Sequence, residues 1–453
     1  MCTTMRGDIT VCWSCIPPST ISRTYSLSIK KHKKHTTSRS LAFLSPLFLL
    51  PKLIKKKSTM AVETEASTPL QRMVSTPQSI PHSHSNTSTK DRSGISLDVP
   101  TCSTEIDLTV LKGPALETAV TKLLRTLFPG LVSPHQKIAM ERVSGALTNA
   151  IYFVTVGKSK LLLRVYGVGC DEFIDRTNEL RWLARLSRLK LCPRLLAIFG
   201  NGRFEEYLPS TTLTASDIHD PMISQQLALR FRQLHSLVHV YPLAISSNTT
   251  ISTSLSVWQC VDRYFHALQQ SAAQMPEQVN MAALGHEITM AKSILTAVDS
   301  PIVFAHNDAQ YGNVLRLTGS NDLVMVDFEY SGYNPRGYDF ANHFCEWMYD
   351  YHSETPESMD PSMFPSIDEQ RRFLTAYVTA TGADNNNKQQ MMMKKVGDVD
   401  ALLQETSAWL MGCHLHWALW GFVQATRSEI DFDYWSYSLQ RLQAFRKELA
   451  FYK

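Results

Sequence analysis

The stretch HNDAQYGN at residues 306–313 decides the fold, together with VDFEY at residues 326–330. In protein kinases the catalytic loop has the pattern H-R-D-x-x-x-x-N, in which the Asp orients the acceptor hydroxyl and the Asn holds a metal ion. His306, Asp308 and Asn313 reproduce that spacing. The sequence therefore predicts that Asp308 is a catalytic base and that Asn313 is a metal ligand.

A second metal-binding Asp is expected at the end of a buried strand, where protein kinases carry the Asp of their DFG motif. Asp327 follows the apolar run LVMV at residues 323–326, which is typical of such a strand. Mg²⁺ usually takes one or two protein carboxylates together with phosphate oxygens, so this set of ligands is sufficient. A single Asp at a strand end is more often a turn cap or an ion-pair partner, but the three residues together predict Mg²⁺-dependent phosphoryl transfer.

From the first motif onward the sequence resembles the choline/ethanolamine kinase family. The resemblance is carried by HNDAQYGNV from His306, by DFEYSGYNPRGYDFANHFCEW at residues 327–347, by WALW at residues 417–420 and by LLRVYG at residues 162–167. It implies an α+β, two-lobed protein kinase-like fold with a small β-rich N-lobe and a larger, mainly helical C-lobe. It also implies MgATP as phosphoryl donor and the hydroxyl of choline or ethanolamine as acceptor.

The chain has 453 residues, of which 44% are hydrophobic, so it can bury one two-lobed domain or two small ones. We expect a disordered, basic, Ser/Thr-rich extension at residues 1–105. The nucleotide-binding N-lobe should then span residues 106–208. The catalytic and choline-binding C-lobe should span residues 209–453, with a low-complexity surface insertion at residues 382–397.

The N-terminal extension carries an unusual charge, since residues 1–60 hold eleven Lys or Arg and a single acidic residue. Its apolar run at residues 41–54 contains two prolines and is shorter than the roughly 20 residues that a membrane-spanning helix needs. We therefore expect a cytoplasmic protein, with weak membrane contact through this segment as an alternative. A start so poor in acids is also compatible with a transit peptide, or translation could begin at Met60. The scattered cysteines suit a reducing compartment, and no nucleic-acid partner is expected.

The hydrophobic periodicity predicts a sheet followed by helices. Strands are expected at residues 137–143, 150–156 and 160–166, followed by a helix at 175–190. The pair Asn201-Gly202 predicts a hairpin between residues 195–199 and 204–208. Further helical segments are expected at about residues 222–237, 257–298, 339–350, 367–380, 398–426 and 433–449.

Several residues match the family's nucleotide site. The loop SGALTN, with Ser144, Gly145 and Asn149, resembles the nucleotide loop whose backbone amides face the phosphates, although a Gly-containing hairpin is common. Arg164 matches the family's phosphate-binding Arg, which can bind phosphate oxygens in a bidentate manner. A surface Arg is the alternative for this position. Glu206 and Leu208 would form the hinge that contacts adenine through the main chain.

One further pairing is expected near the phosphates. Glu179 on the following helix could pair with Arg164, as the αC Glu of protein kinases pairs with the strand Lys. A solvated charge on the helix surface is nearly as good an interpretation.

The acceptor site needs different chemistry, because a quaternary ammonium donates no hydrogen bonds and is best held by aromatic faces near a carboxylate. Trp417 and Trp420 lie three residues apart and therefore on one helix face, although such a pair is more often part of a core. The resemblance assigns Gln310 to the acceptor hydroxyl and Asp339 to bracing the site. It places the choline pocket at Tyr330, Glu346, Tyr351, Trp417, Trp420 and Tyr437.

Three alternatives stay open at this point. The chain could be an ethanolamine kinase or a dual choline/ethanolamine kinase, because the scaffold is shared. It could be an aminoglycoside or other small-molecule phosphotransferase, which the paired tryptophans argue against. It could also be an inactive kinase fold that serves as a binding module, which the intact Asp308, Asn313 and Asp327 argue against. Family members commonly dimerise, so a homodimer is expected.

Overall fold

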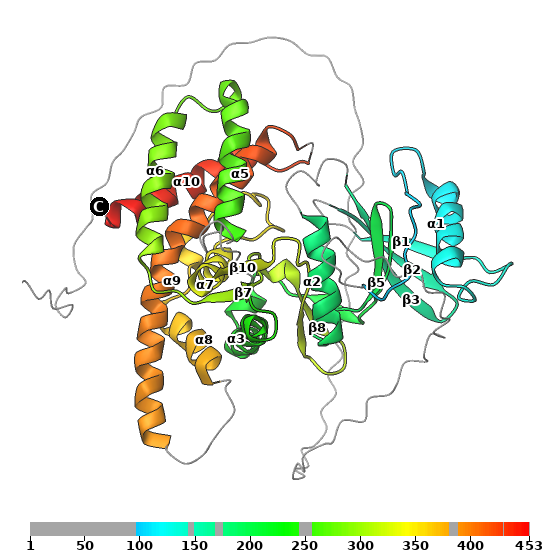
Figure 1. Ribbon diagram of the computed structural model, residues 1–453, viewed down its shortest axis with the longest axis horizontal. Coiled ribbons are helices and arrows are strands. Elements are labelled where there is room, and N and C mark those ends of the chain that lie inside the picture. The colour runs from blue at the N-terminus through cyan, green and yellow to red at the C-terminus, as the bar shows by residue number, and fades with distance from the viewer. Residues whose placement is uncertain are drawn as a thin grey trace, which may run out of the picture. The chain divides into compact units, whose positions relative to one another are not determined.

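A five-stranded antiparallel sheet forms the first part of the fold, with the strand order β1-β2-β3-β5-β4 (Figure 1). The computed structural model describes residues 97–143, 149–167, 175–243, 256–379, 388–428 and 430–452. The three predicted strands are present, and the second strand of the predicted hairpin begins two residues early, at Gly202. The strands are β1 (Ala139–Val143), β2 (Asn149–Val156), β3 (Ser159–Tyr166), β4 (Leu195–Phe199) and β5 (Gly202–Glu206).

One face of this sheet is covered by helix α1 (Gly113–Leu127), which the sequence analysis did not predict. Its buried residues Leu116, Val120 and Leu124 pack with Val154 and Leu163 of the sheet. Pro114 lies in the first turn of the helix, a position where proline is favoured. Its apolar residues recur at helical spacing, so the signal was present in the sequence.

The described part of the chain begins at residue 97, before the predicted N-lobe boundary at residue 106. Thr101 forms a parallel bridge with Ile198 of β4, and the main-chain N–H of Cys102 donates to the Ile198 carbonyl over 3.1 Å. Ile198 in turn donates to the Pro100 carbonyl over 3.0 Å. These bonds use main-chain groups alone, which explains why no side-chain pattern marked the segment.

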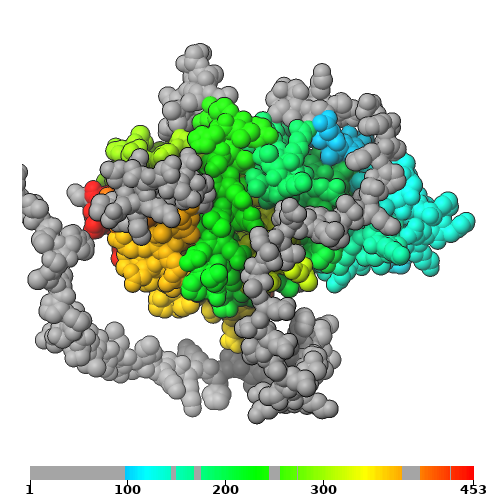
Figure 2. Space-filling model, turned by 90° about the horizontal axis from the view of Figure 1, so that it is seen from below, coloured from blue at the N-terminus to red at the C-terminus, as the bar shows by residue number. Residues whose placement is uncertain are grey.

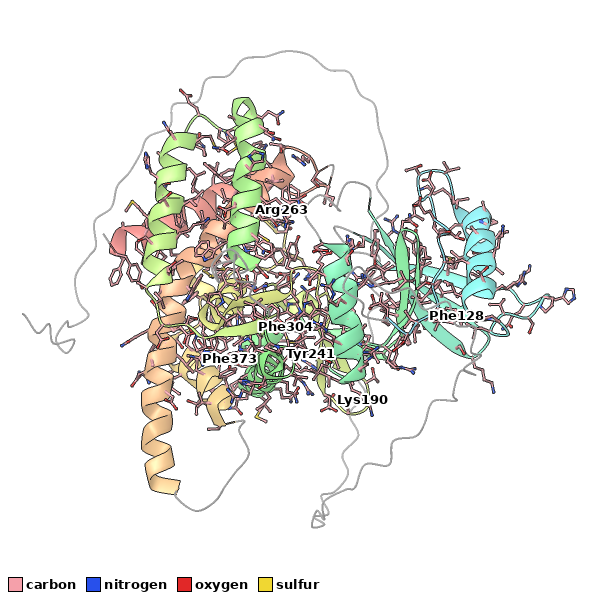
Figure 3. All side chains as sticks on the ribbon, viewed as in Figure 1. Phe128, Lys190, Tyr241, Arg263, Phe304 and Phe373 are labelled. Carbon is pink, nitrogen blue, oxygen red and sulfur yellow. The ribbon has the colours of Figure 1, made fainter. Side chains whose placement is uncertain are left out.

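Helix α2 (Arg176–Arg188) lies between β3 and β4 in the sequence, close to the predicted range. The Trp182 side chain of this helix packs on Phe304, with ring centroids 3.9 Å apart, and on Tyr241, with ring centroids 5.9 Å apart. Phe304 and Tyr241 lie near each other in Figure 3. This aromatic cluster attaches α2 to strand β7 (Ile302–Ala305), which leads into the HNDAQYGN stretch.

The remaining helices form the larger part of the fold and bury two apolar clusters. In Figure 2 the green surface around α3 adjoins the orange surface of α8 and α9, and contacts between α3 and α8 and between α8 and α9 agree with this view. The helices are α3 (Pro221–His235), α5 (Ser256–Gln270), α6 (Met281–Thr296), α7 (Arg336–Glu346), α8 (Ile367–Thr379), α9 (Lys388–Ala425) and α10 (Tyr434–Phe451).

Two of the predicted helical segments differ clearly from the helices of the structure. The expected helical stretch at residues 257–298 is divided into α5 and α6. Pro276 lies in the connection between them, because proline is not tolerated in the interior of a helix. Helix α9 begins ten residues before the predicted residue 398, at Lys388, so it includes the last part of the expected insertion at 382–397. Residues 382–387 lie outside the described part of the chain.

Two small antiparallel sheets position the motifs. Strand β7 pairs with β10 (Gly332–Pro335), while β8 (Val314–Leu317) lies between β6 (Ser210–Thr212) and β9 (Leu323–Met325). Residues 306–313 connect β7 to β8, and residues 326–331 connect β9 to β10. Both motifs therefore occupy loops that are fixed at each end by a strand. The α+β class predicted from the sequence is confirmed.

Within the described ranges, no helix combines the length and the apolar character required to span a bilayer.

We predict that Gly202→Ala destabilises the protein by about 2 kcal/mol, the usual cost of overpacking. A Cβ at residue 202 would lie 2.3 Å from the Arg164 carbonyl oxygen and 2.3 Å from the Phe199 ring. Chemical denaturation monitored by circular dichroism measures the change, with the exposed Thr118→Ala on α1 as control. An unfolding midpoint equal to that of the wild type would show that the β4–β5 hairpin tolerates the extra methyl group.

Candidate active site

The β7–β8 loop brings Asp308 and Asn313 together, as the spacing predicted. The Asn313 side-chain amide donates to the Asp308 main-chain carbonyl over 2.9 Å and to its Oδ2 over 2.8 Å. The Asp308 main-chain N–H donates to His306 Nδ1 over 3.3 Å. Burial lowers the pKa of His306, whose Nε2 lies 3.0 Å from the Val326 carbonyl and donates to it. A neutral imidazole thus joins the two motif loops.

Asp339 on α7 holds the start of this loop. Its Oδ2 accepts from the His306 main-chain N–H over 3.0 Å, and its Oδ1 accepts from the Asn307 N–H over 2.7 Å. His235 Nε2 lies 2.9 Å from the same carboxylate and donates to it. Burial by itself would raise the pKa of Asp339, but the hydrogen bond and charge of His235 outweigh it and lower this pKa. The structure thus places Asp339 as a brace beneath the loop.

Two residues of the motif loops have left-handed backbone conformations. Asn307 has φ 68° and Asp327 has φ 64°, a region in which Asn and Asp are enriched among non-glycine residues. The Asn307 side chain donates to the Tyr330 carbonyl over 2.8 Å and accepts from Asn334 over 2.7 Å. The loop geometry is therefore over-determined by polar contacts, as is common where strained residues serve a site.

Asp327 faces Arg164 across the two parts of the fold. Arg164 NH1 lies 3.3 Å from each carboxylate oxygen of Asp327. Burial acts to raise the pKa of Asp327, and the charge of Arg164 overcomes it, so this pKa lies below its usual range. The pKa of Asp308 is instead raised well above its usual range, first by burial and then by the charges of Glu346, Asp327 and Glu329.

The oxygens of Asn313 and Asp327 suit Mg²⁺ in the company of phosphates. Among the described residues, no three His, Cys, Asp or Glu side chains converge into a self-sufficient metal site. Mg²⁺ usually binds one or two carboxylates and completes its shell with phosphate and water.

A chain of buried ion pairs extends from Arg164 into the sheet. Glu205 Oε1 lies 3.5 Å from Arg164 Nε and 2.6 Å from Arg203 Nε. Arg203 is 1% exposed and also pairs with Glu179 over 2.8 Å. Arg164 and Arg203 are direct partners on β3 and β5, so Glu205 separates two like charges.

The expected pairing of Glu179 with Arg164 is wrong. Glu179 instead pairs with Arg203 and with Arg176, whose NH1 lies 2.9 Å from Glu179 Oε2. Arg176 also pairs with Glu329 over 3.3 Å. The series of ion pairs therefore returns to the VDFEY loop two residues after Asp327. Sequence reasoning missed Arg176 and Arg203, because nothing in a single sequence indicates which of several arginines meets a given acid.

The remaining nucleotide-site predictions are placed as follows. Asn149 donates to Glu329 Oε2 over 3.4 Å and accepts from Arg176 over 3.1 Å, which puts it beside the same loop. Glu206 turns its carboxylate toward Arg194, which lies 3.2 Å away. Leu208 follows β5, and its carbonyl accepts from the Ser210 hydroxyl over 2.8 Å. Ser144 and Gly145 lie outside the described residues.

The predicted acceptor residues form one connected aromatic cluster. Trp417 contacts Tyr330 and Trp420, with ring centroids 5.5 and 5.3 Å apart, and Trp420 contacts Tyr437 at 6.1 Å. The Trp420 indole donates to the Tyr330 hydroxyl over 3.0 Å. Tyr330, Tyr351 and Trp420 are half-buried, whereas Trp417 and Tyr437 are buried. The cluster thus has a buried floor and a partly accessible side.

Glu346 lies at the base of this cluster. Its Oε2 accepts from the Tyr351 hydroxyl over 2.7 Å, and its Oε1 accepts from Arg441 NH2 over 2.6 Å. Tyr349 links the two ends, since its ring stacks on Tyr351 at 5.6 Å and contacts Tyr437 at 5.4 Å. Sequence reasoning placed Glu346 but missed Arg441 and Tyr349.

A separate cavity of about 620 Å³ lies beside the start of α2. Tyr166, Arg176, Asn201 and Arg263 are among the residues that line it, and Arg263 is marked on α5 in Figure 3. None of the predicted catalytic, metal or acceptor residues lines this cavity. This cavity is therefore distinct from the candidate active site, which is identified by the contacts among its side chains described above.

The fold and these residues define a phosphotransferase of protein kinase-like architecture. The family model for choline/ethanolamine kinase matches residues 140–446. The chain is 35% identical to probable choline kinase 2 of Arabidopsis thaliana over 312 residues, which cover 67% of this chain and 83% of that relative. It is 32% identical to the choline/ethanolamine kinase of Homo sapiens over 327 residues, with 68% and 80% covered. The chain belongs to the choline/ethanolamine kinase family.

Solved structures agree with this fold. The ethanolamine kinase of Plasmodium vivax superposes with a TM-score of 0.62 at 23% identity, covering 74% of this chain and 91% of that chain. The choline kinase of Cryptosporidium parvum gives 0.59 at 23% identity, covering 73% and 94%. The predicted family and kinase-like fold are confirmed. Membership of this kinase family implies ATP as phosphoryl donor and choline or ethanolamine as acceptor.

We predict that Asp339→Asn lowers both stability and turnover. The neutral amide loses the charge-assisted bonds to His306, Asn307 and His235, so the free energy of unfolding should fall by roughly 3 kcal/mol. A displaced catalytic loop should lower kcat about 100-fold. Thermal melts and steady-state kinetics measure the two effects, with Asp262→Asn, which alters only an exposed ion pair, as control.

The pH dependence of stability gives a second measurement. Because the pKa of Asp339 is lowered on folding, its charge stabilises the native state fully above the usual Asp value of about 3.9. This stabilisation is lost progressively as the pH falls from that value through the lower pKa of the folded state. Between pH 7 and pH 3 the wild type should lose more stability than Asp339→Asn. Parallel curves for the two proteins would contradict the bracing role.

Proposed function

We propose that this protein transfers the γ-phosphoryl group of ATP to the hydroxyl of choline. The product, phosphocholine, is the first intermediate of phosphatidylcholine synthesis by the CDP-choline route. One observation carries the proposal, namely the aromatic cluster around Glu346 in electrostatic reach of Asp308, whose pKa that acid helps to raise. Aromatic faces suit a quaternary ammonium, and Asp308 would face its hydroxyl.

The catalytic step is assigned to the β7–β8 loop. Asp308 orients the choline hydroxyl and accepts its proton as the oxygen attacks the γ-phosphorus. Gln310 is fixed because its Oε1 accepts from the Gly312 N–H over 3.0 Å, and we assign its amide N–H groups to the acceptor hydroxyl. Positioning and electrostatic stabilisation would supply most of the rate.

The nucleotide and metal would lie between this loop and the sheet. We propose that Asn313 and Asp327 hold Mg²⁺, which when bound neutralises charge on the β- and γ-phosphates. Arg164 would contact phosphate oxygens, and Asn149 would support the loop that includes Ser144 and Gly145. We assign adenine to the main chain of Glu206 and Leu208, because the Glu206 carboxylate already engages Arg194.

The acceptor pocket is assigned to the cluster described above. The faces of Tyr330, Trp417, Trp420 and Tyr437 would hold the trimethylammonium group. Tyr351 would complete the pocket through its hydrogen bond to Glu346, which supplies the carboxylate.

Ethanolamine is the second candidate acceptor. The comparisons favour keeping it, because a relative in Homo sapiens is named choline/ethanolamine kinase and one in Arabidopsis thaliana, 28% identical, is named probable ethanolamine kinase. An inactive binding module is the alternative of another class. The bonded Asp308–Asn313 pair beside Asp327 argues against it.

The decisive experiment measures ADP release by the purified full chain with MgATP and, separately, choline, ethanolamine and an aminoglycoside. We expect the highest kcat/KM with choline and no turnover when Mg²⁺ is removed by EDTA. A higher kcat/KM with ethanolamine would make that amino alcohol the substrate. Equal background rates with all three compounds would favour the binding module.

The location and assembly of the protein are also proposals. We infer a cytoplasmic enzyme, with a basic N-terminal segment that can contact anionic membranes weakly. Comparing the localisation of the full chain with that of a chain starting at Met60 tests both statements. A homodimer stays a prediction of the family resemblance, and analytical ultracentrifugation tests it.

We predict that Asp308→Ala retains the fold and nucleotide binding but lowers kcat about a thousandfold, the middle of the range for loss of a general base. Asp322→Ala in the β8–β9 turn is the matched control, since it removes an Asp from a neighbouring loop. Circular dichroism, ATP titration and choline-dependent ADP release are the measurements. Wild-type turnover in Asp308→Ala would refute the assignment of the base.

A further inference from the structure

We propose that Arg441 is a positioning residue that sets acceptor preference, because it neutralises Glu346 and so leaves cation recognition to the aromatic faces. The pocket then favours a quaternary over a primary ammonium. This inference rests on the proposed function, since it concerns the acceptor pocket assigned above.

The contacts of Glu346 show that both of its oxygens are engaged by this chain. Oε1 accepts from Arg441 NH2 over 2.6 Å, and Oε2 accepts from the Tyr351 hydroxyl over 2.7 Å. Arg441 is 0% exposed and Glu346 is 2% exposed. The pair is therefore formed away from water, where its charges compensate each other and breaking it is costly.

The guanidinium is also held from other sides. Its central carbon lies 4.5 Å from the Tyr349 ring centroid and 5.3 Å from that of Tyr437. Arg441 NH1 lies 3.4 Å from His414 Nδ1. Arg441 thus has one fixed place, between the carboxylate and two rings of the same cluster, and cannot swing away without giving up several contacts.

The consequence differs between the two candidate acceptors. A primary ammonium carries donors that need hydrogen-bond acceptors when water is removed, and burying them without partners is unfavourable. A quaternary ammonium has no such donors and is attracted by aromatic faces. With both Glu346 oxygens engaged and its charge balanced, the pocket offers more to choline than to ethanolamine.

Arg441→Met is the first test, with kcat/KM measured for both acceptors at saturating MgATP. Freeing Glu346 Oε1 should raise the ratio of kcat/KM for ethanolamine over choline about tenfold, or about 1.4 kcal/mol. Arg441→Lys, which keeps the positive charge, should hold the ratio closer to the wild-type value. A purely structural role would lower both activities in proportion and leave the ratio unchanged, which would overturn the proposal.

The matched control is Arg446→Met on the same helix. Arg446 also pairs with a carboxylate, that of Glu287, over 3.0 Å. Its side chain is 36% exposed, and Glu287 is not one of the proposed acceptor residues. The Arg446→Met variant should have the same ratio of kcat/KM for ethanolamine over choline as the wild type. A rise in the ratio equal to that of Arg441→Met would show a nonspecific effect of charge loss from α10 and would overturn the proposal.

A second comparison covers the case in which Arg441→Met does not fold. Glu346→Gln leaves Arg441 positively charged beside the cation, so the KM for choline should rise. The double variant Glu346→Gln/Arg441→Met removes both charges and should recover about tenfold of that loss. No recovery in a folded double variant would overturn the proposal. If the wild type phosphorylates neither choline nor ethanolamine, the proposed function itself fails, which is a different outcome.

Discussion

The Asp339 carboxylate is the constraint on which the catalytic geometry depends. It is fully buried, it accepts from two consecutive main-chain N–H groups of the β7–β8 loop, and His235 from α3 holds it in place. The left-handed conformation of Asn307 is maintained by these bonds and by its side-chain contacts to Tyr330 and Asn334. The direction of Asp308, one residue later, therefore follows from the packing of α7 against β7 and α3.

A second constraint connects the VDFEY loop to the sheet. In the protein kinase pattern one Lys–Glu pair joins the strand to the helix. Here a series of buried ion pairs makes this connection and ends at Glu329 in the VDFEY loop. In order from the sheet, its members are Arg164, Glu205, Arg203, Glu179, Arg176 and Glu329. Buried ion pairs add little net stability compared with an apolar core, but removing one member leaves a charge without compensation. The series of ion pairs therefore holds Arg164 and Asp327 in place, and substitution of any one of its members is expected to be destabilising.

The sequence allowed the motif residues to be predicted because their spacing is local. Asp308 and Asn313 lie on one short loop, and Asp327 follows a recognisable strand. Their spacing along the chain is therefore enough to indicate their chemistry. The partner of Glu179 could not be predicted, since it depends on strand register, which places Arg203 opposite Arg164. Arg441 is 95 residues from Glu346, and their contact depends on how α7 and α10 meet. The segment at residues 100–102 was missed for a different reason, because it pairs through its main chain.

The two aspartates of the motifs show how one site can need opposite ionisation behaviour. Both are half-buried, and partial loss of contact with water acts on each to raise its pKa. Asp327 faces Arg164, and that charge brings its pKa below the usual range, which suits a ligand that must be ionised to bind a cation. Asp308 receives its hydrogen bond from the neutral amide of Asn313 and is surrounded by Glu346, Asp327 and Glu329, so its pKa moves upward. Environments that separate the pKa values of two like groups identify which is the base. This difference in environment supports our proposal that Asp327 binds the metal and Asp308 accepts the proton.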